Sequence, residues 1–194
     1  MHGKHRADGK CTRTCRGGGM ENYRLVPLIS SEELVKCVDD LALRINRDYE
    51  GKSLIVVGIL KGSFIFLADL VRKLAPALTL DFVRLASYGD QSETSGIVRL
   101  TKDVEVSVHG RHVLVVEDIV DTGITLKWFL DHLQHLEPES VKVCALIDKS
   151  ERRRVNLSLD YVGISLEKGF LVGYGLDYSE RHRNLPAIYE VLFD

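Results

Sequence analysis

The sequence has no apolar stretch approaching the roughly 20 residues that a membrane-spanning helix requires. It also has only four cysteines in 194 residues. Cys11 and Cys15 lie in a polar N-terminal segment, whereas Cys37 and Cys144 lie in segments with an apolar pattern, so cysteine usage does not indicate a disulfide framework. These shortages disfavour a membrane protein and a disulfide-stabilised domain. They make the cytoplasm the default expectation, with no membrane partner.

Two nucleotide-binding fingerprints are missing as well. There is neither a G-x-x-x-x-G-K-[ST] segment nor a G-x-G-x-x-G segment after a strand. An ordinary ATPase or dinucleotide enzyme is therefore disfavoured. The chain has 45% hydrophobic and 28% charged residues and a formal net charge of -2, a composition typical of a globular protein.

The first residues differ from the rest of the chain. Residues 1–19 are basic, rich in His and Gly, and lack the apolar core of a secretory signal. We expect them to be a disordered extension, and residues 20–194 to form a single domain. The extension holds four possible soft-metal ligands, but their spacing matches no zinc motif. They are His2, His5, Cys11 and Cys15.

Strand and helix patterns alternate along most of the remaining sequence. Ser30 and Glu33 form a capping-box pattern, which predicts a helix to about Tyr49. Strands are predicted at 53–60, 78–87, 111–118 and 140–148, helices at 64–74 and 122–136, and a further extended piece at 97–108. This alternation predicts an α/β fold, a mostly parallel twisted sheet flanked by helices.

The end of the sequence follows a different pattern. Residues 161–166, 170–174 and 188–193 are short extended pieces with no helix between them. They could form a small antiparallel subdomain that caps a site as a hood.

One segment, Val115–Leu126 (VVEDIVDTGITL), has the features of an anion-binding loop. It opens a helix, whose N-terminus presents unpaired backbone N–H groups, and Gly123 allows a close approach to a ligand. Thr122 and Thr125 add hydroxyl donors. The plainer alternative is that Asp121 and Thr122 only cap the helix.

Two adjacent carboxylates, Glu117 and Asp118, precede this loop. They would repel a phosphate group, but they suit the vicinal hydroxyls of a sugar or a hydrated magnesium ion. One loop could therefore hold a ribose 5-phosphate from end to end.

This segment resembles the phosphoribosyl pyrophosphate-binding motif of the type I phosphoribosyltransferases. The resemblance implies that Glu117 and Asp118 contact the ribose hydroxyls. It also implies that the 5-phosphate is bound by Asp121, Thr122, Gly123, Ile124 and Thr125.

The similarity extends over residues 22–194 to the hypoxanthine-guanine phosphoribosyltransferases. Leu60-Lys61-Gly62-Ser63 resembles their pyrophosphate loop, in which the Leu-Lys peptide is often cis, and Ser87-Tyr88 resembles the start of their mobile loop. Lys149 matches their purine-recognising lysine. Phe170–Tyr178, with Arg183 beyond, resembles their segment for base stacking, metal binding and pyrophosphate binding. The family usually forms homodimers or homotetramers.

In such an enzyme a purine ring nitrogen displaces pyrophosphate from C1 of the ribose. Lys61, Arg183 and Mg²⁺ ions held near Asp177 would stabilise the leaving pyrophosphate, with Glu117 and Asp118 as further metal-binding candidates. Alternatively, Lys61 is an exposed turn lysine and Arg183 a solvated arginine.

The purine must be read, stacked and deprotonated. Asp121 is the candidate base, because it borders the phosphate loop where N7 of the purine could lie. Lys149 offers only donors, so it favours a 6-oxopurine over adenine. Phe170 would stack on the base, and backbone groups of Leu171 and Asp177 would read its other edge. Alternatively, Phe170 is a core aromatic and Lys149 a surface lysine.

The reacting sugar must be protected from water, and the polar segment 87–95 has the composition of a lid, although most polar loops are only connectors. Two rival functions stay open. One is a sensor of phosphoribosyl pyrophosphate that binds nucleic acid, for which Arg152, Arg153, Arg154 and the basic N-terminus are the only hints. The other is a pyrimidine or adenine phosphoribosyltransferase. The preferred hypothesis has no nucleic-acid partner.

Overall fold

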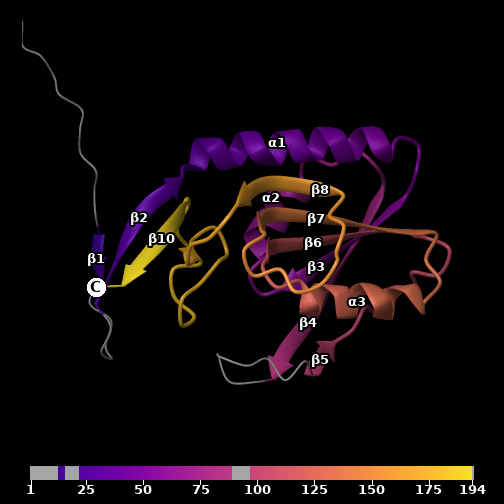
Figure 1. Ribbon diagram of the computed structural model, residues 1–194. Coiled ribbons are helices and arrows are strands. Elements are labelled where there is room, and N and C mark those ends of the chain that lie inside the picture. Colours follow the sequence, from indigo (N-terminus) through magenta and orange to yellow (C-terminus); the bar gives the residue numbers. More distant parts are fainter. Residues whose placement is uncertain (1–12, 16–21, 89–96, 194) are drawn as a thin grey trace, which may run out of the picture.

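The computed structural model of the chain describes residues 13–15, 22–88 and 97–193. They form a six-stranded sheet with the strand order β5-β4-β3-β6-β7-β8 and a smaller four-stranded sheet with the order β1-β2-β10-β9 (Figure 1). No helix in these ranges is both long and apolar enough to cross a membrane.

The large sheet confirms the predicted α/β fold. Five of its strands run parallel, and only β5 is antiparallel to its neighbour β4. The strands are β3 (Leu54–Leu60), β4 (Leu78–Tyr88), β5 (Ile97–Lys102), β6 (His112–Val120), β7 (Ser140–Lys149) and β8 (Tyr161–Leu166).

Three helices cover the two faces of this sheet: α1 (Ser31–Asp48), α2 (Phe64–Val71) and α3 (Ile124–Gln134). The predicted capping box is present, because Ser30 Oγ accepts the amide of Glu33 while Glu33 accepts the amide of Ser30. Alternate residues of β3 enter two separate cores. Leu54 and Val56 pack with α1 and α2, whereas Ile55 and Val57 pack with α3.

The smaller sheet corrects the expected arrangement of the C-terminal strands. Its members are β1 (Arg13–Cys15), β2 (Tyr23–Ile29), β9 (Leu171–Val172) and β10 (Ile188–Phe193), all antiparallel to their neighbours. The expectation that 161–166 would join this sheet was wrong, because β8 pairs in parallel with β7. Parallel strands were predicted where strands alternate with helices. Because the connection 150–160 contains no helix, this signal was missing for β8. Of the expected piece 170–174 only Leu171–Val172 forms a strand, and it pairs antiparallel with 188–193 as expected.

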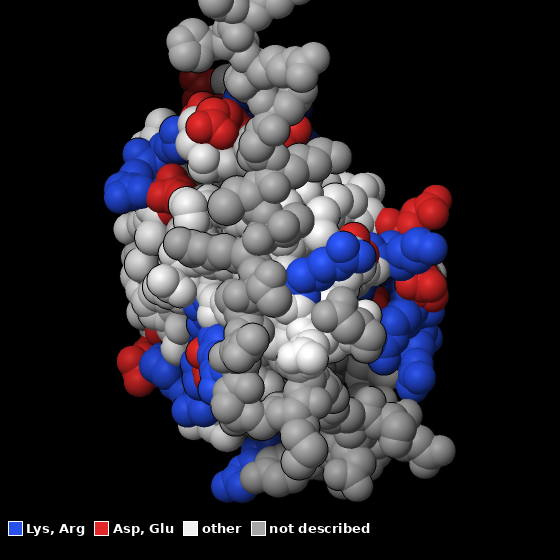
Figure 2. All heavy atoms as spheres, turned by 90° about the vertical axis from the view of Figure 1, so that its left-hand side faces the viewer, with Lys and Arg blue, Asp and Glu red and all other residues white. Residues whose placement is uncertain are grey.

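The first and last described strands belong to the smaller sheet, where β2 lies between β1 and β10 (Figure 1). Arg13–Cys15 thus depart from the disorder expected for residues 1–19, while residues 1–12 and 16–21, with His2, His5 and Cys11, lie outside the described residues. Figure 2 shows this side of the molecule, where described basic and acidic side chains lie beside one another.

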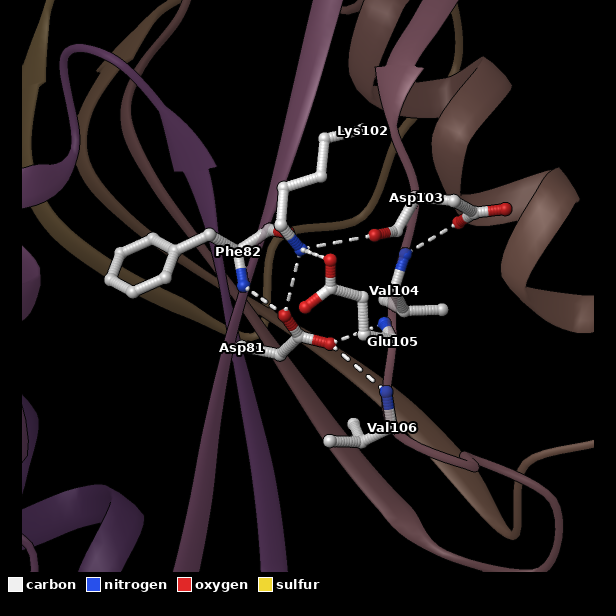
Figure 3. Close-up of polar contacts among 7 residues, drawn as sticks. All are labelled: Asp81, Phe82, Lys102, Asp103, Val104, Glu105 and Val106. Atoms are coloured by element: carbon white, nitrogen blue, oxygen red, sulfur yellow. Dashed lines mark hydrogen bonds and ion pairs between the residues drawn. The ribbon is translucent and has the colours of Figure 1, made fainter.

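A buried carboxylate holds the connection between β5 and β6 against β4 (Figure 3). Asp81 on β4 is 6% exposed. Its two oxygens accept the amides of Phe82, Glu105 and Val106 and the ammonium of Lys102. The base of the β4–β5 hairpin is therefore fixed.

Candidate active site

The predicted site residues lie mainly where β3, β6 and β7 end. These strands are parallel neighbours, so the loops that follow them share one edge of the sheet. The chain leaves β3 toward β4 and leaves β6 toward β7, which makes this edge a topological switch point, where α/β proteins usually bind ligands. The segment 170–183 meets this edge, because the Gly175 backbone lies so close to the Gly62 carbonyl that a Cβ would overlap it.

The loop between β6 and α3 has the geometry of a phosphate cradle. Gly123 has φ +78°, a conformation that favours glycine. It is the N-cap residue of α3 and has no side chain that could bond to the first amides of the helix. A cavity of about 160 Å³ opens beside the loop. It is lined by Glu117, Ile119, Val120, Asp121, Thr122, Gly123, Thr125 and Leu126. Ile124 supplies the first helical amide, with Thr122 Oγ1 3.5 Å away.

The carboxylates of Glu117 and Asp118 project to different sides of β6, as adjacent strand residues do. Glu117 lines the cavity of the phosphate loop, whereas Asp118 fills the space beside Gly62, where a Cβ would overlap its carboxylate. The sequence analysis predicted that Glu117 and Asp118 act as one pair, but each carboxylate faces a different part of the site.

The loop after β3 is shaped by its backbone. The Leu60-Lys61 peptide is cis, as the family resemblance implies. Ser63 is fully buried and donates from its hydroxyl to the Ile59 carbonyl at 2.6 Å. The loop therefore presents Lys61 outward while Gly62 stays against Asp118.

Lys61, Asp177 and Arg183 are brought together by a residue that the sequence did not indicate, Glu180. Its carboxylate lies 2.8 Å from Lys61 Nζ and 3.2 Å from Arg183. Arg183 also pairs with Asp177 at 2.8 Å and donates to the Gly175 carbonyl. The Arg183 side chain is only 20% exposed, which excludes a solvated arginine. Lys61 is half exposed but paired. Nothing in the pattern ERHR marks Glu180 as a bridge.

Lys149 and Asp121 also meet. Lys149 is 8% exposed, which excludes a surface lysine, and its Nζ lies 3.7 Å from Asp121 Oδ2. Arg152 approaches the same oxygen at 3.5 Å. The Asp121 carboxylate thus faces two cations and does not cap α3.

Phe170 and Leu171 have opposite environments. Phe170 is 45% exposed, so it is not a core aromatic, and its ring packs edge-on against Tyr178 and Phe193. Leu171 is buried in β9. Ser87 ends β4 together with Tyr88, so Tyr88 belongs to the strand, and the predicted lid residues 89–95 lie outside the described residues.

Comparison with known proteins gives a consistent picture. The phosphoribosyl transferase domain family matches residues 29–179. The hypoxanthine-guanine phosphoribosyltransferase of Aquifex aeolicus is 42% identical over 169 residues, covering 87% of this chain and 95% of that protein. This chain belongs to the hypoxanthine-guanine phosphoribosyltransferase family.

Solved structures of the family share the fold. A hypoxanthine-guanine phosphoribosyltransferase from Bacillus anthracis superimposes with a TM-score of 0.81 at 48% identity, covering 86% of this chain and 97% of that one. The bifunctional protein TilS/HprT of Listeria monocytogenes is 44% identical over 178 residues, which span 91% of this chain but only 28% of that protein.

Electrostatics at this phosphoribosyltransferase site favour a cation near the acidic residues. Burial and the neighbouring Asp118 raise the pKa of Glu117 well above its usual value. Burial also raises the pKa of Asp118 to about 6, with Asp177 adding to the shift and Arg183 opposing it. A bound cation would offset the cost of keeping these carboxylates ionised.

Three predicted residues carry buried side-chain atoms with no hydrogen-bond partner among the described protein groups: Glu117 Oε2, Asp121 Oδ1 and Arg183 Nε. Buried polar atoms are usually satisfied, so we expect a ligand or water to complete these groups. In the described ranges, no three His, Cys, Asp or Glu side chains converge on one metal position. Glu117, Asp118 and Asp177 therefore do not form a ready-made cage. Mg²⁺ needs only one or two carboxylates when substrate oxygens and water complete its shell.

Proposed function

We propose that the chain acts in purine salvage and transfers the 5-phosphoribosyl group from phosphoribosyl pyrophosphate to hypoxanthine or guanine. The products are IMP or GMP and pyrophosphate. The observation that carries this proposal is the meeting of Lys149 and Asp121 beside the phosphate loop. A purine-reading donor, a proton acceptor and an anion cradle then share one edge of the sheet.

The two phosphate ends of phosphoribosyl pyrophosphate bind to different loops. The 5-phosphate lies against Thr122–Thr125, where the first amides of α3 and two hydroxyls donate. The pyrophosphate lies toward Lys61 and Arg183, two cations that Glu180 already holds together. The ribose lies between these two loops, where Glu117 and Asp118 face it.

The purine binds with its 6-oxygen toward Lys149 and one face on Phe170. Backbone groups of Leu171 and Asp177 read its other edge. As the ring nitrogen bonds to C1 and pyrophosphate leaves, the N7 proton passes to Asp121, whose Oδ1 has no other partner among the described groups.

Mg²⁺ fits the acidic residues of this site. Asp118 and Asp177 would hold it together with substrate oxygens, and its charge would stabilise the departing pyrophosphate. Glu117, the other metal-binding candidate, lies on the opposite side of β6 and would not share this ion. A bound cation would favour the ionised form of Asp118, whose pKa is raised to about 6 by burial.

A panel of bases tests the function. Phosphoribosyl pyrophosphate and Mg²⁺ are supplied with hypoxanthine, guanine, xanthine, adenine or uracil, and nucleotide and pyrophosphate are measured. We expect turnover of hypoxanthine or guanine. Turnover of adenine or uracil alone would contradict the 6-oxopurine assignment, and no turnover at all would favour the nucleic-acid-binding sensor.

Asp121→Asn tests the proton acceptor. The amide cannot take the proton, so we expect kcat to fall by about 10²–10⁴-fold while the Kd for phosphoribosyl pyrophosphate changes little. Steady-state kinetics and calorimetric titration measure the two quantities. An unchanged kcat would remove Asp121 as the base.

The cellular location, oligomeric state and partners of the enzyme are proposed from the family alone. We place it in the cytoplasm as a homodimer or homotetramer, with no membrane or nucleic-acid partner. Light scattering of the purified chain measures its mass in solution, and a monomer would contradict the assembly.

A further inference from the structure

Arg153 does not behave like a member of a basic surface patch. It stands between Arg152 and Arg154 in a run of three arginines, but its side chain is only 19% exposed. The flanking arginines are exposed. A long cationic side chain that turns inward must find partners there, because burying it unpaired is costly.

The partners of Arg153 come from the ends of two neighbouring strands. Its Nε donates to the Asp121 carbonyl at 3.0 Å, and Nη2 lies 3.2 Å from the Val120 carbonyl. The same Nη2 pairs with the Asp148 carboxylate and lies 3.5 Å from the Lys149 carbonyl. One guanidinium therefore touches the backbone of both Asp121 and Lys149.

The stem of Arg153 packs against the phosphate loop. A Cβ at Gly123 would lie 3.2 Å from Arg153 Cδ and 3.5 Å from its Nε. The next amide along the chain, that of Arg154, donates to the Thr122 carbonyl at 3.0 Å. The segment after β7 thus closes over the loop that follows β6.

We propose that Arg153 is a positioning residue that fixes the Asp121 base relative to Lys149 and the phosphate loop. This inference rests on the roles proposed above for Asp121 and Lys149. The planar guanidinium places several donors in a fixed fork, so it can hold two loops at one spacing. A lysine has the same charge but no such fork.

Arg153→Lys is the central test, because it keeps the charge and removes the geometry. We expect kcat to fall by about tenfold to a hundredfold, the cost of a misplaced catalytic group, while KM for phosphoribosyl pyrophosphate rises much less. Arg154→Lys is the matched control, since its side chain has no hydrogen-bond or ion-pair partner among the described residues. It should leave kcat unchanged. Thermal melting establishes that each variant is folded.

A double-mutant cycle shows whether Arg153 acts through Asp121. Adding Arg153→Lys to Asp121→Asn should cost little further rate, because the base is already lost. Additive losses, full activity of Arg153→Lys, or a loss in Arg153→Lys without one in Asp121→Asn would overturn the proposal.

A readout independent of turnover separates this proposal from the function on which it rests. Amide hydrogen exchange of residues 121–125 should be faster in Arg153→Lys than in the wild type and unchanged in Arg154→Lys. Faster exchange in a chain that turns over no base would contradict the proposed function but support the positioning role of Arg153. Unchanged exchange in a chain that turns over hypoxanthine would overturn only the positioning role of Arg153.

Discussion

Gly62 leaves the space that the Asp118 carboxylate fills, and it also lies against the Gly175 backbone. In Gly62→Ala the added methyl would displace the carboxylate, because the backbone on the other side cannot yield. We expect kcat/KM for phosphoribosyl pyrophosphate to fall at least about tenfold, while stability falls by only about 1–3 kcal/mol. Steady-state kinetics and denaturant unfolding measure the two effects.

Gly110→Ala is the control for this substitution. Gly110 has φ +62° and nothing within 4 Å of an added Cβ, so the change strains the backbone away from the site. It should lower stability without altering kinetics. If Gly62→Ala retains wild-type kcat/KM, the Asp118 carboxylate does not need its present position.

Lys149 is expected to select the 6-oxopurine. In Lys149→Gln an amide that can both donate and accept replaces an ammonium that only donates. We expect kcat/KM for hypoxanthine to fall at least about tenfold, and the preference for hypoxanthine over adenine to narrow. The control is Lys127→Gln, on the exposed surface of α3. An unchanged ratio between the two bases would show that Lys149 does not read position 6.

At the residue scale the sequence was informative where a motif combined several residue types. The D-T-G-I-T loop could be singled out from its own chemistry, whereas Lys61, Lys149 and Arg183 were singled out through the family resemblance. Glu180 and Arg153 could not, because their partners come from distant segments. An acidic or basic residue in a polar turn has no local pattern that reveals such a partner.

At the scale of elements, the β4–β5 hairpin depends on Asp81. Burial raises the pKa of this carboxyl, but bonds from the amides of Glu105 and Phe82 and from Lys102 outweigh burial and hold the pKa below its usual value. A lowered pKa in the folded state stabilises the fold above the unfolded pKa, and this stabilisation is lost as the pH falls through the folded value.

Asp81→Asn should therefore destabilise the chain by about 1–3 kcal/mol near neutral pH, because it removes a charged acceptor from several donors. The difference from the wild type should shrink below about pH 4. Denaturant unfolding between pH 2.5 and 7, values chosen to bracket that range, measures it. Asp131→Asn, on the exposed face of α3, is the control. A difference independent of pH would show that the charge of Asp81 contributes nothing.

The periodicity of the sequence was sufficient for elements that bury a regular face. α1 and its capping box, β3, β6 and β7 follow the predicted ranges closely. β2 was missed, although Tyr23, Leu25 and Ile29 point inward, because three partly or fully exposed residues lie between Leu25 and Ile29. The partner of β8 could not be predicted, since a strand pattern does not state which sheet edge it joins.

At the scale of the whole molecule, the binding mode that we propose takes the phosphate groups of one substrate to loops from both parts of the fold. Mg²⁺ should be required for this, because Asp118 and Asp177 would otherwise repel the pyrophosphate. A chelator should abolish turnover, and Mg²⁺ should restore it. Phosphoribosyl pyrophosphate at about 100 times its Kd should stabilise the chain by about 2.7 kcal/mol only when Mg²⁺ is present. Calorimetric melting measures this, and equal stabilisation without Mg²⁺ would contradict the metal's role in binding.

The pairing of β2 with β10 has a consequence for how the molecule is made. Synthesis runs from the N-terminus, so β2, the phosphate loop and Lys149 emerge from the ribosome before β10. Chains begin to fold as they emerge. The segment that carries Asp177 and Arg183 gains the support of β10, through its pairing with β9 and the bond from the Val191 amide to the Phe170 carbonyl, only after β10 has been made. The proposed cradle for the 5-phosphate can thus form before the segment that we propose to bind the pyrophosphate, and we expect catalytic competence only once β10 is in place.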